Sequence, residues 1–77
     1  MNNNTTDVMI HTQTTLSEDQ FSEIARQVKT IDGVVRFDRN PRKPNFILVA
    51  YKAGQIRALT ILNKLTRLGF NASLIGI

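Results

Sequence analysis

Few side chains in this sequence could hold a metal ion. The chain has 77 residues, with one histidine, His11, and no cysteine. Met9 stands two positions before His11, so in a strand both side chains would lie on one face. Such a pair could hold copper(I), but two ligands from one strand make a poor site, and soft metals favour thiolates. We therefore expect no bound metal or cofactor, and Met9 and His11 are the only candidate ligands.

Groups that could carry catalysis are also sparse. The six acidic residues are scattered over expected helix starts and turns. No nucleophile stands beside a base, and no glycine-rich loop could cradle a phosphate. Ser17 is better explained as a helix cap than as a nucleophile. The sequence therefore predicts a protein that is not an enzyme and has no catalytic residue.

Basic residues form the most distinct charged cluster. Four of them lie close together in the sequence, namely Arg36, Arg39, Arg42 and Lys43. The net charge of +4 favours an acidic partner, nucleic acid or an anionic surface, although it also serves solubility. With no long basic run in the chain, solubility is the simpler explanation for the charge as a whole.

The first helix has a strong start signal. Ser17 can cap it, and Gln20, three positions later, completes a capping box. Apolar residues at helical spacing follow from Phe21 to Ile31. The pair Asp32-Gly33 is typical of the end of a helix, so the spacing predicts a helix over residues 18–31.

The remaining elements follow from apolar patterning and turn residues. A second helix is predicted from Ala53 or Gly54 to a glycine cap at Gly69. Runs rich in β-branched and aromatic residues predict four strands, at residues 8–12, 34–38, 46–51 and 70–75, the last with room to extend to Ile77. We expect residues 1–7 to be a disordered N-terminal tail and residues 8–77 to form one domain.

The order strand, helix, strand, strand, helix, strand predicts an α+β fold. It is the ferredoxin-like βαββαβ sandwich, in which two helices cover one face of a four-stranded antiparallel sheet. The other face is left open to solvent or to a partner. This open face is where the sequence places a binding surface.

With these elements placed, the chain resembles the heavy-metal-associated domains, a family of small copper chaperones, mercury carriers and modules of metal-pumping ATPases. The resemblance covers about residues 8–75 and is carried by three pieces of sequence: Ile31-Asp32-Gly33-Val34, Val49-Ala50-Tyr51 and Leu68-Gly69-Phe70-Asn71-Ala72. It implies the ferredoxin-like fold, with Ile47, Val49 and Tyr51 facing the helices.

The family's Met-x-Cys-x-x-Cys metal motif is missing from this chain. Counted back from Gly33, its two cysteine positions fall on Ser17 and Gln20. A hydroxyl and a carboxamide are poor ligands for copper(I) or mercury. The resemblance therefore implies the fold of a metal carrier without its means of binding soft metals.

The predicted function is a non-enzymatic protein-interaction or regulatory module. If Ile47 and Val49 face the helices, then Phe46 and Leu48 point outward and Met9 joins them. Exposed apolar patches usually mark interaction surfaces. We expect a protein partner or self-association as a homodimer, through the residues Met9, Phe46, Leu48, Arg39, Arg42 and Lys43.

Two alternatives stay open. Single-stranded RNA could bind the open sheet face and the basic turn, as it does in other proteins of this topology, although the aromatic residues are few. Copper could be carried by the unusual ligands Met9 and His11.

The first six residues lack the basic and apolar stretches of a secretory signal, and no apolar run could span a membrane, so we expect a cytoplasmic protein without membrane contact.

Overall fold

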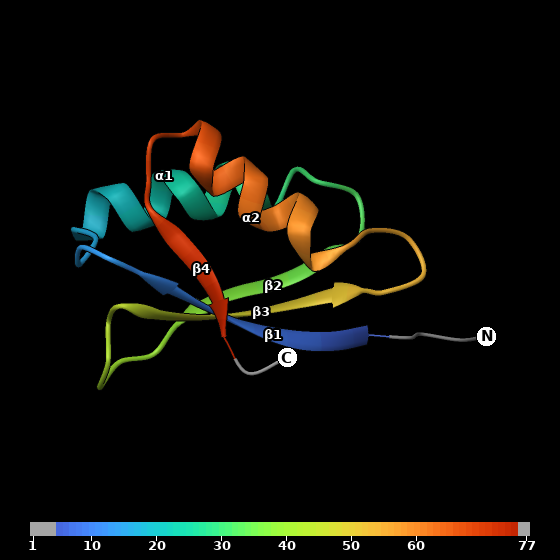
Figure 1. The fold of residues 1–77 in the computed structure, drawn as a ribbon, viewed down its shortest axis with the longest axis horizontal. Helices are drawn as coiled ribbons and strands as arrows, with labels where there is room; N and C mark the ends of the chain where they lie inside the picture. Colours follow the sequence, from blue (N-terminus) through green and yellow to red (C-terminus); the bar gives the residue numbers. More distant parts are fainter. Residues whose placement is uncertain (1–4, 76–77) are drawn as a thin grey trace.

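The computed structural model describes residues 5–75, which fold into one sheet and two helices (Figure 1). In chain order the elements are β1 (Thr5–Thr12), α1 (Glu18–Val28), β2 (Val34–Arg39), β3 (Phe46–Lys52), α2 (Ala58–Arg67) and β4 (Ala72–Ile75).

The four strands form one antiparallel sheet in the order β2-β3-β1-β4. Both helices lie on the same side of this sheet, and its other side carries no helix (Figure 1). The predicted ferredoxin-like βαββαβ sandwich is confirmed. Within the described range, neither helix is long and apolar enough to cross a membrane.

Helix α1 begins where the capping box places it. The Gln20 amide donates to the Ser17 Oγ over 3.1 Å, and the Ser17 amide donates to the Gln20 side chain over 2.9 Å. The helix ends at Val28, three residues before the predicted end at Ile31. The Thr30 hydroxyl donates to the Gln27 carbonyl over 2.6 Å, and this local bond competes with a further helical turn.

Helix α2 begins at Ala58, so the prediction of a start near Ala53 or Gly54 is wrong. The Lys52 carbonyl accepts bonds from the amides of Gln55 and Ile56, which close a turn directly after β3. The cap residue Arg57 is extended and makes no side-chain cap bond. With no capping side chain at this end, the sequence carries no local start signal.

At its other end α2 stops in a Schellman motif. Gly69 has a φ of +96°, its amide donates to the Thr66 carbonyl, and the Phe70 amide donates to the Leu65 carbonyl. The predicted glycine cap is confirmed. Because Phe70 takes part in this cap, β4 begins at Ala72 rather than at Phe70, and the extension predicted for residues 76–77 lies outside the described residues.

Strand β1 is longer than predicted. It starts at Thr5, which pairs with Lys52, and Asp7 pairs with Ala50. The far end of β3 therefore gives residues 5–7 a partner, and the prediction of a disordered tail is wrong for these three residues. Residues 1–4 of that tail lie outside the described residues.

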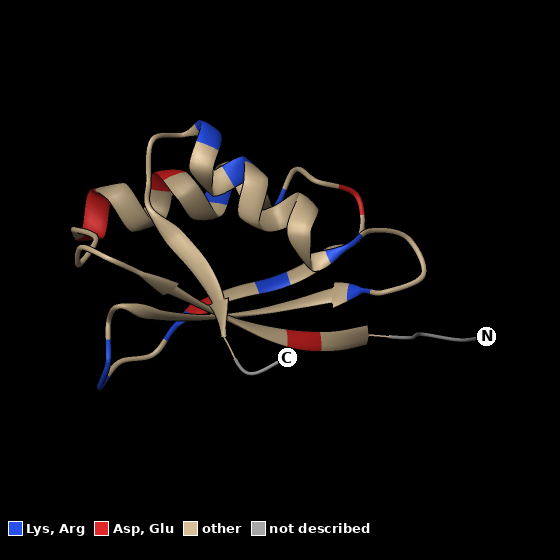
Figure 2. Cartoon of the chain, viewed as in Figure 1, with Lys and Arg blue, Asp and Glu red and all other residues tan. Residues whose placement is uncertain are grey.

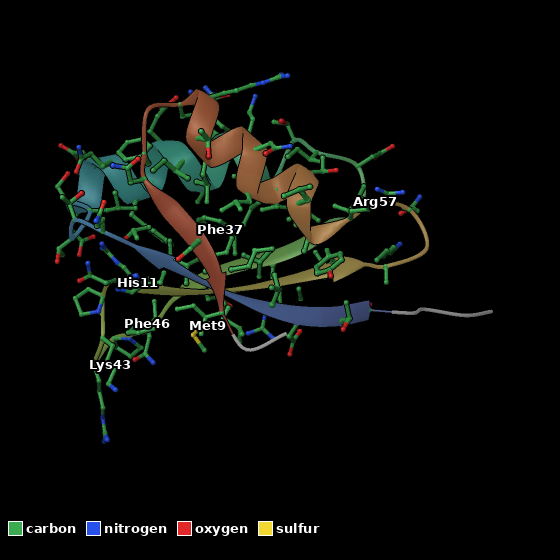
Figure 3. The ribbon with its side chains drawn as sticks, in the orientation of Figure 1. Met9, His11, Phe37, Lys43, Phe46 and Arg57 are labelled. Carbon is green, nitrogen blue, oxygen red and sulfur yellow. The ribbon has the colours of Figure 1, made fainter. Side chains whose placement is uncertain are left out.

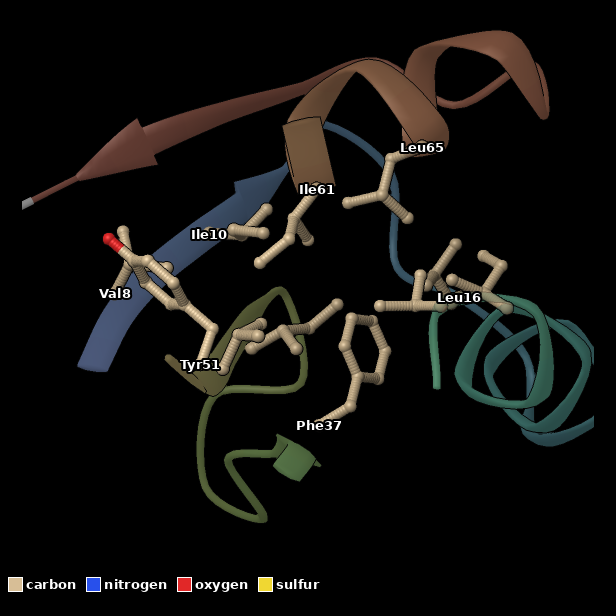
Figure 4. Packing of buried hydrophobic residues seen from close by; sticks show 11 residues of the cluster. Val8, Ile10, Leu16, Phe37, Tyr51, Ile61 and Leu65 are labelled. Atoms are coloured by element: carbon tan, nitrogen blue, oxygen red, sulfur yellow. The ribbon is translucent and has the colours of Figure 1, made fainter. Parts of the chain in front are cut away.

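The core fills the space between the sheet and the helices (Figure 4). Alternate residues of the central strands point into it, and Phe37 lies beneath α1 with its ring centroid 5.5 Å from that of Phe21. The buried apolar residues of the core cluster are Val8, Ile10, Leu16, Ile24, Val28, Phe37, Ile47, Val49, Tyr51, Ile61 and Leu65. This one-sided core fixes which side chains must point outward.

Candidate functional site

The sheet face opposite the helices carries the apolar residues that the sequence placed there. Met9 on β1 pairs with Leu48 on β3 and with Ile75 on β4, while His11 pairs with Phe46. Leu48 is 40% exposed and Ile75 is 39% exposed. We call these five residues the open face. Figure 3 shows Met9, His11 and Phe46 on the side of the sheet away from the helices, with Phe37 on the helical side.

Ala50 points to the same side but adds little area, because it is only 7% exposed. Its register neighbours are Arg36 and Asp7, so the sheet becomes polar toward this end. The apolar surface is therefore concentrated around Leu48 and Met9 and toward Phe46.

A shallow depression of about 380 Å³ interrupts the open face. Its apolar walls are Met9, Phe46 and Ile75, and Asn40 and Lys43 complete its rim. A partner side chain placed there would meet apolar surface on several sides and one positive charge at the edge.

Three side chains gather at one end of the open face. The rings of His11 and Phe46 lie with centroids 4.9 Å apart and tilted by 51°. The Lys43 ammonium lies 5.8 Å from the centre of the Phe46 ring, within the range of a cation–π contact. Phe46 therefore presents an aromatic surface next to a positive charge.

The turn between β2 and β3 is held by its own side chains. The Asn40 Oδ1 accepts bonds from the backbone amides of Arg42 and Lys43 over 2.9 and 3.2 Å. This Asx-type turn leaves the side chains of both residues exposed. Figure 2 shows their positive charges in the hairpin that extends below the sheet, on the side away from the helices.

Arg39 belongs to the other side of the sheet, so the structure does not bring it together with Arg42 and Lys43. Its register partner is the core residue Ile47. Its guanidinium donates to the Leu16 carbonyl over 2.6 Å and lies 4.6 Å from the centre of the Phe21 ring. Arg39 ties β2 to the loop before α1 and is not available to a partner on the open face.

Arg36 does lie on the open side, but it already has a partner there. It forms an ion pair of 3.0 Å with Asp38, two positions along the same strand. The basic cluster predicted from the sequence is thus divided, and Arg42 and Lys43 are the members that border the open face.

The candidate metal ligands Met9 and His11 lie side by side on the open face, as the strand alternation predicted. His11 packs against Phe46, and within residues 5–75 no group of three or more histidine, cysteine, aspartate or glutamate residues could hold a metal ion. In the loop before α1, Ser17 and Gln20 bond each other in the capping box. A hydroxyl and a carboxamide do not fit a soft metal there.

The sequence presents His11 only as a candidate metal ligand and does not predict its contact with Phe46. The ring opposite Phe46 is that of His11. The contact follows from the residue-by-residue register of β1 against β3. That register depends on where both strands begin and end, and the predicted start of β1 at residue 8 is wrong.

Comparison with known proteins relates this fold to metal-binding domains. No family model matches the chain, and no curated protein sequence matches it. Among solved structures, oxidised MerP from Ralstonia metallidurans superposes with a TM-score of 0.80 over 94% of this chain and 99% of its own, at 11% identity.

Two further structures are similarly close. A copper-binding domain of a P-type ATPase superposes with a TM-score of 0.79 at 11% identity, covering 91% of this chain and 93% of its own. A yeast copper transporter domain, studied without and with copper(I), gives a TM-score of 0.77 at 19% identity, covering 90% and 93%. At these identities the likeness is one of fold. The chain has the fold of the heavy-metal-associated domains, without the cysteines of their metal motif.

Proposed function

We propose that this chain is a non-enzymatic protein-interaction module that uses the fold of a metal carrier without binding soft metals. The observation that carries the proposal is the apolar row of Leu48, Met9 and Ile75, which lies across the sheet on the face that the helices leave uncovered. Leu48 and Ile75 are exposed, and Met9 between them is half-buried. Large exposed apolar side chains that gather on one face favour a partner surface over solvent.

The loop before α1 supports the second half of the proposal. In this chain its side chains stabilise the helix start, and Arg39 holds its backbone at Leu16. A loop of this kind contributes a fixed helix terminus and no thiolate. This loop therefore keeps the start of the helix in place but offers no thiolate that could bind or transfer a soft metal ion.

Two exposed leucines on opposite layers give a matched test. Leu48 lies on the open face and is 40% exposed, whereas Leu59 lies on α2 and is 52% exposed. Burying one such side chain contributes about 1.5–3 kcal/mol before the costs of association. Leu48→Gln should therefore reduce binding by about tenfold or more, and Leu59→Gln should leave it unchanged.

The measurement has two parts. Size-exclusion chromatography with light scattering reports self-association of the wild type and both variants. Quantitative mass spectrometry identifies proteins that the immobilised chain retains from an extract of its source cells. We expect a dimer or a retained protein that Leu48→Gln loses and Leu59→Gln keeps. A monomer in all three, with no protein lost specifically by Leu48→Gln, would refute the proposal.

A further inference from the structure

We infer that the partner docks through an acidic segment, in which a large apolar side chain enters the depression between Met9, Phe46 and Ile75 and a neighbouring carboxylate pairs with Lys43. The inference rests on the proposed function, since it names the chemistry of the partner on that same face. It is carried by the juxtaposition of an apolar depression with a positive rim.

The depression is the reason to expect a large apolar side chain on the partner. Its walls come from three different strands, with Met9 on β1, Phe46 on β3 and Ile75 on β4. The sheet fixes the backbone of all three residues, so a concave surface is already present before a ligand arrives, and this lowers the entropic cost of binding. Its volume of about 380 Å³ and its three apolar walls fit one aliphatic or aromatic side chain of a partner.

The charges at the rim of the depression are the reason to expect a carboxylate on the partner. Among residues 5–75, no carboxylate lies within ion-pairing distance of Lys43 or Arg42, whereas Arg36 and Arg39 each have one. The Asp38 carboxylate on the open side is already paired with Arg36. Asp7 lies opposite Ala50, four positions along β1 from the His11–Phe46 pair. Among residues 5–75, the end of the face that holds the depression therefore carries positive charges without an ion-pair partner, and the Asp38 carboxylate beside Leu48 is held by Arg36.

This charge pattern favours a partner of opposite sign over a second copy of the chain. Each copy carries a net charge of +4, and docking two basic rims against each other is opposed by their repulsion. An acidic segment is attracted instead, and its on-rate should fall as salt is added.

Nucleic acid would satisfy the charges but not the surface between them. The open face is mostly aliphatic and thioether, with Leu48, Ile75 and Met9 in its central row. Its ring pair, His11 and Phe46, is tilted by 51° and offers no common plane on which successive bases could stack. The face fits protein side chains better than bases.

A random peptide library displayed on phage tests the inference without knowledge of the natural partner. The wild type is the bait, and Leu48→Gln serves as the bait for counter-selection. We expect enriched peptides to carry aspartate or glutamate within a few positions of a large apolar residue. One enriched peptide is then synthesised with a fluorescent label, together with a form in which each carboxylate is replaced by its amide.

Affinities for both peptides are measured by fluorescence anisotropy with the wild type and two charge variants. Lys43→Glu reverses the rim, whereas Arg57→Glu makes the same change of net charge at the far end of the molecule (Figure 3). For the acidic peptide we expect Lys43→Glu to weaken binding about three- to tenfold and Arg57→Glu less than twofold, in line with one exposed ion pair lost and reversed. The amide form should bind the wild type about as weakly as the acidic peptide binds Lys43→Glu.

The other outcomes separate the inference from the proposed function. Enrichment of neutral apolar peptides, or equal binding of the amide form, would overturn the acidic partner and leave the docking face intact. No enrichment beyond the Leu48→Gln bait would count against both. Tight binding of a labelled single-stranded oligonucleotide that Lys43→Glu abolishes, with no peptide enriched, would replace the protein partner by nucleic acid. A dimer of the wild type that Leu48→Gln dissociates would replace it by a second copy.

Discussion

Arg39 and Arg42 stand three positions apart in the sequence, yet their surroundings differ completely. The Arg39 side chain is only 15% exposed, and it joins the Leu16 carbonyl and the Phe21 ring. Arg42 lies in the exposed turn. The same residue type thus links two elements of the fold at one position and lies exposed in a turn at the other.

The sequence could have separated these two roles in part. Strand alternation puts Arg39 on the same face as Phe37, which is a core residue. What alternation does not show is a carbonyl within reach of the guanidinium, because the loop that carries Leu16 is distant in the sequence. Side chains of this kind are found only when the elements are packed.

We predict that Arg39→Ala lowers the free energy of unfolding by about 1–3 kcal/mol. The substitution leaves the Leu16 carbonyl without a charged donor and removes the cation–π contact with Phe21. The matched variant Arg42→Ala should change stability by less than about 0.5 kcal/mol, since its side chain is exposed. Urea denaturation followed by circular dichroism measures both, and equal stabilities of the two variants would contradict this role for Arg39.

At the scale of elements, the ends that can be predicted from the sequence are those with a strong local signal. The start of α1 was predicted because Ser17 and Gln20 form a cap within four residues, and the end of α2 because Gly69 is a cap of its own. The start of α2 was missed, since Arg57 offers no capping bond. The start of β1 was missed because Thr5 is paired by a strand far away in sequence.

The loop before α1 gives a prediction about metal binding. Replacing both capping residues, as Ser17→Cys with Gln20→Cys, places two thiols three positions apart at the helix start. There the backbone amides and the helix dipole stabilise thiolates. We expect this double variant to bind one copper(I) ion in competition with a chromogenic chelator, and the wild type to bind none.

The same substitutions remove the capping box, so the metal-free double variant should be less stable than the wild type by about 1 kcal/mol. Glu23→Cys with Arg26→Cys is the control, because it places two cysteines at the same spacing in the exposed middle of α1. Equal copper affinity in the two double variants would show that the loop has no special geometry for a metal. Stoichiometric copper on the wild type would overturn the proposal that metal binding is lost.

For the molecule as a whole, the layers can be predicted from the sequence, but the pattern of β3 does not show which of its faces turns toward the helices. Residues 46–51 are apolar at every position, so periodicity alone leaves both faces equivalent. The resemblance to the heavy-metal-associated domains suggested the orientation, and the burial of Ile47, Val49 and Tyr51 confirms it. The open face exists because this strand has apolar residues on both sides and helices on only one.

In a domain this small, a substitution in the core and one on the open face should differ clearly in their effect on the free energy of unfolding. At about 0.05–0.15 kcal/mol per residue, a chain of 77 residues has a free energy of unfolding of about 4–12 kcal/mol. Phe37 is 2% exposed in the core, whereas Leu48 is 40% exposed on the open face. We predict that Phe37→Ala lowers stability by about 3–5 kcal/mol, a large share of that total, while Leu48→Ala lowers it by less than about 1 kcal/mol. Urea denaturation measures both, and a loss at Leu48 as large as that at Phe37 would mean that the open face helps to hold the fold together, and that its exposed side chains are not kept for a partner.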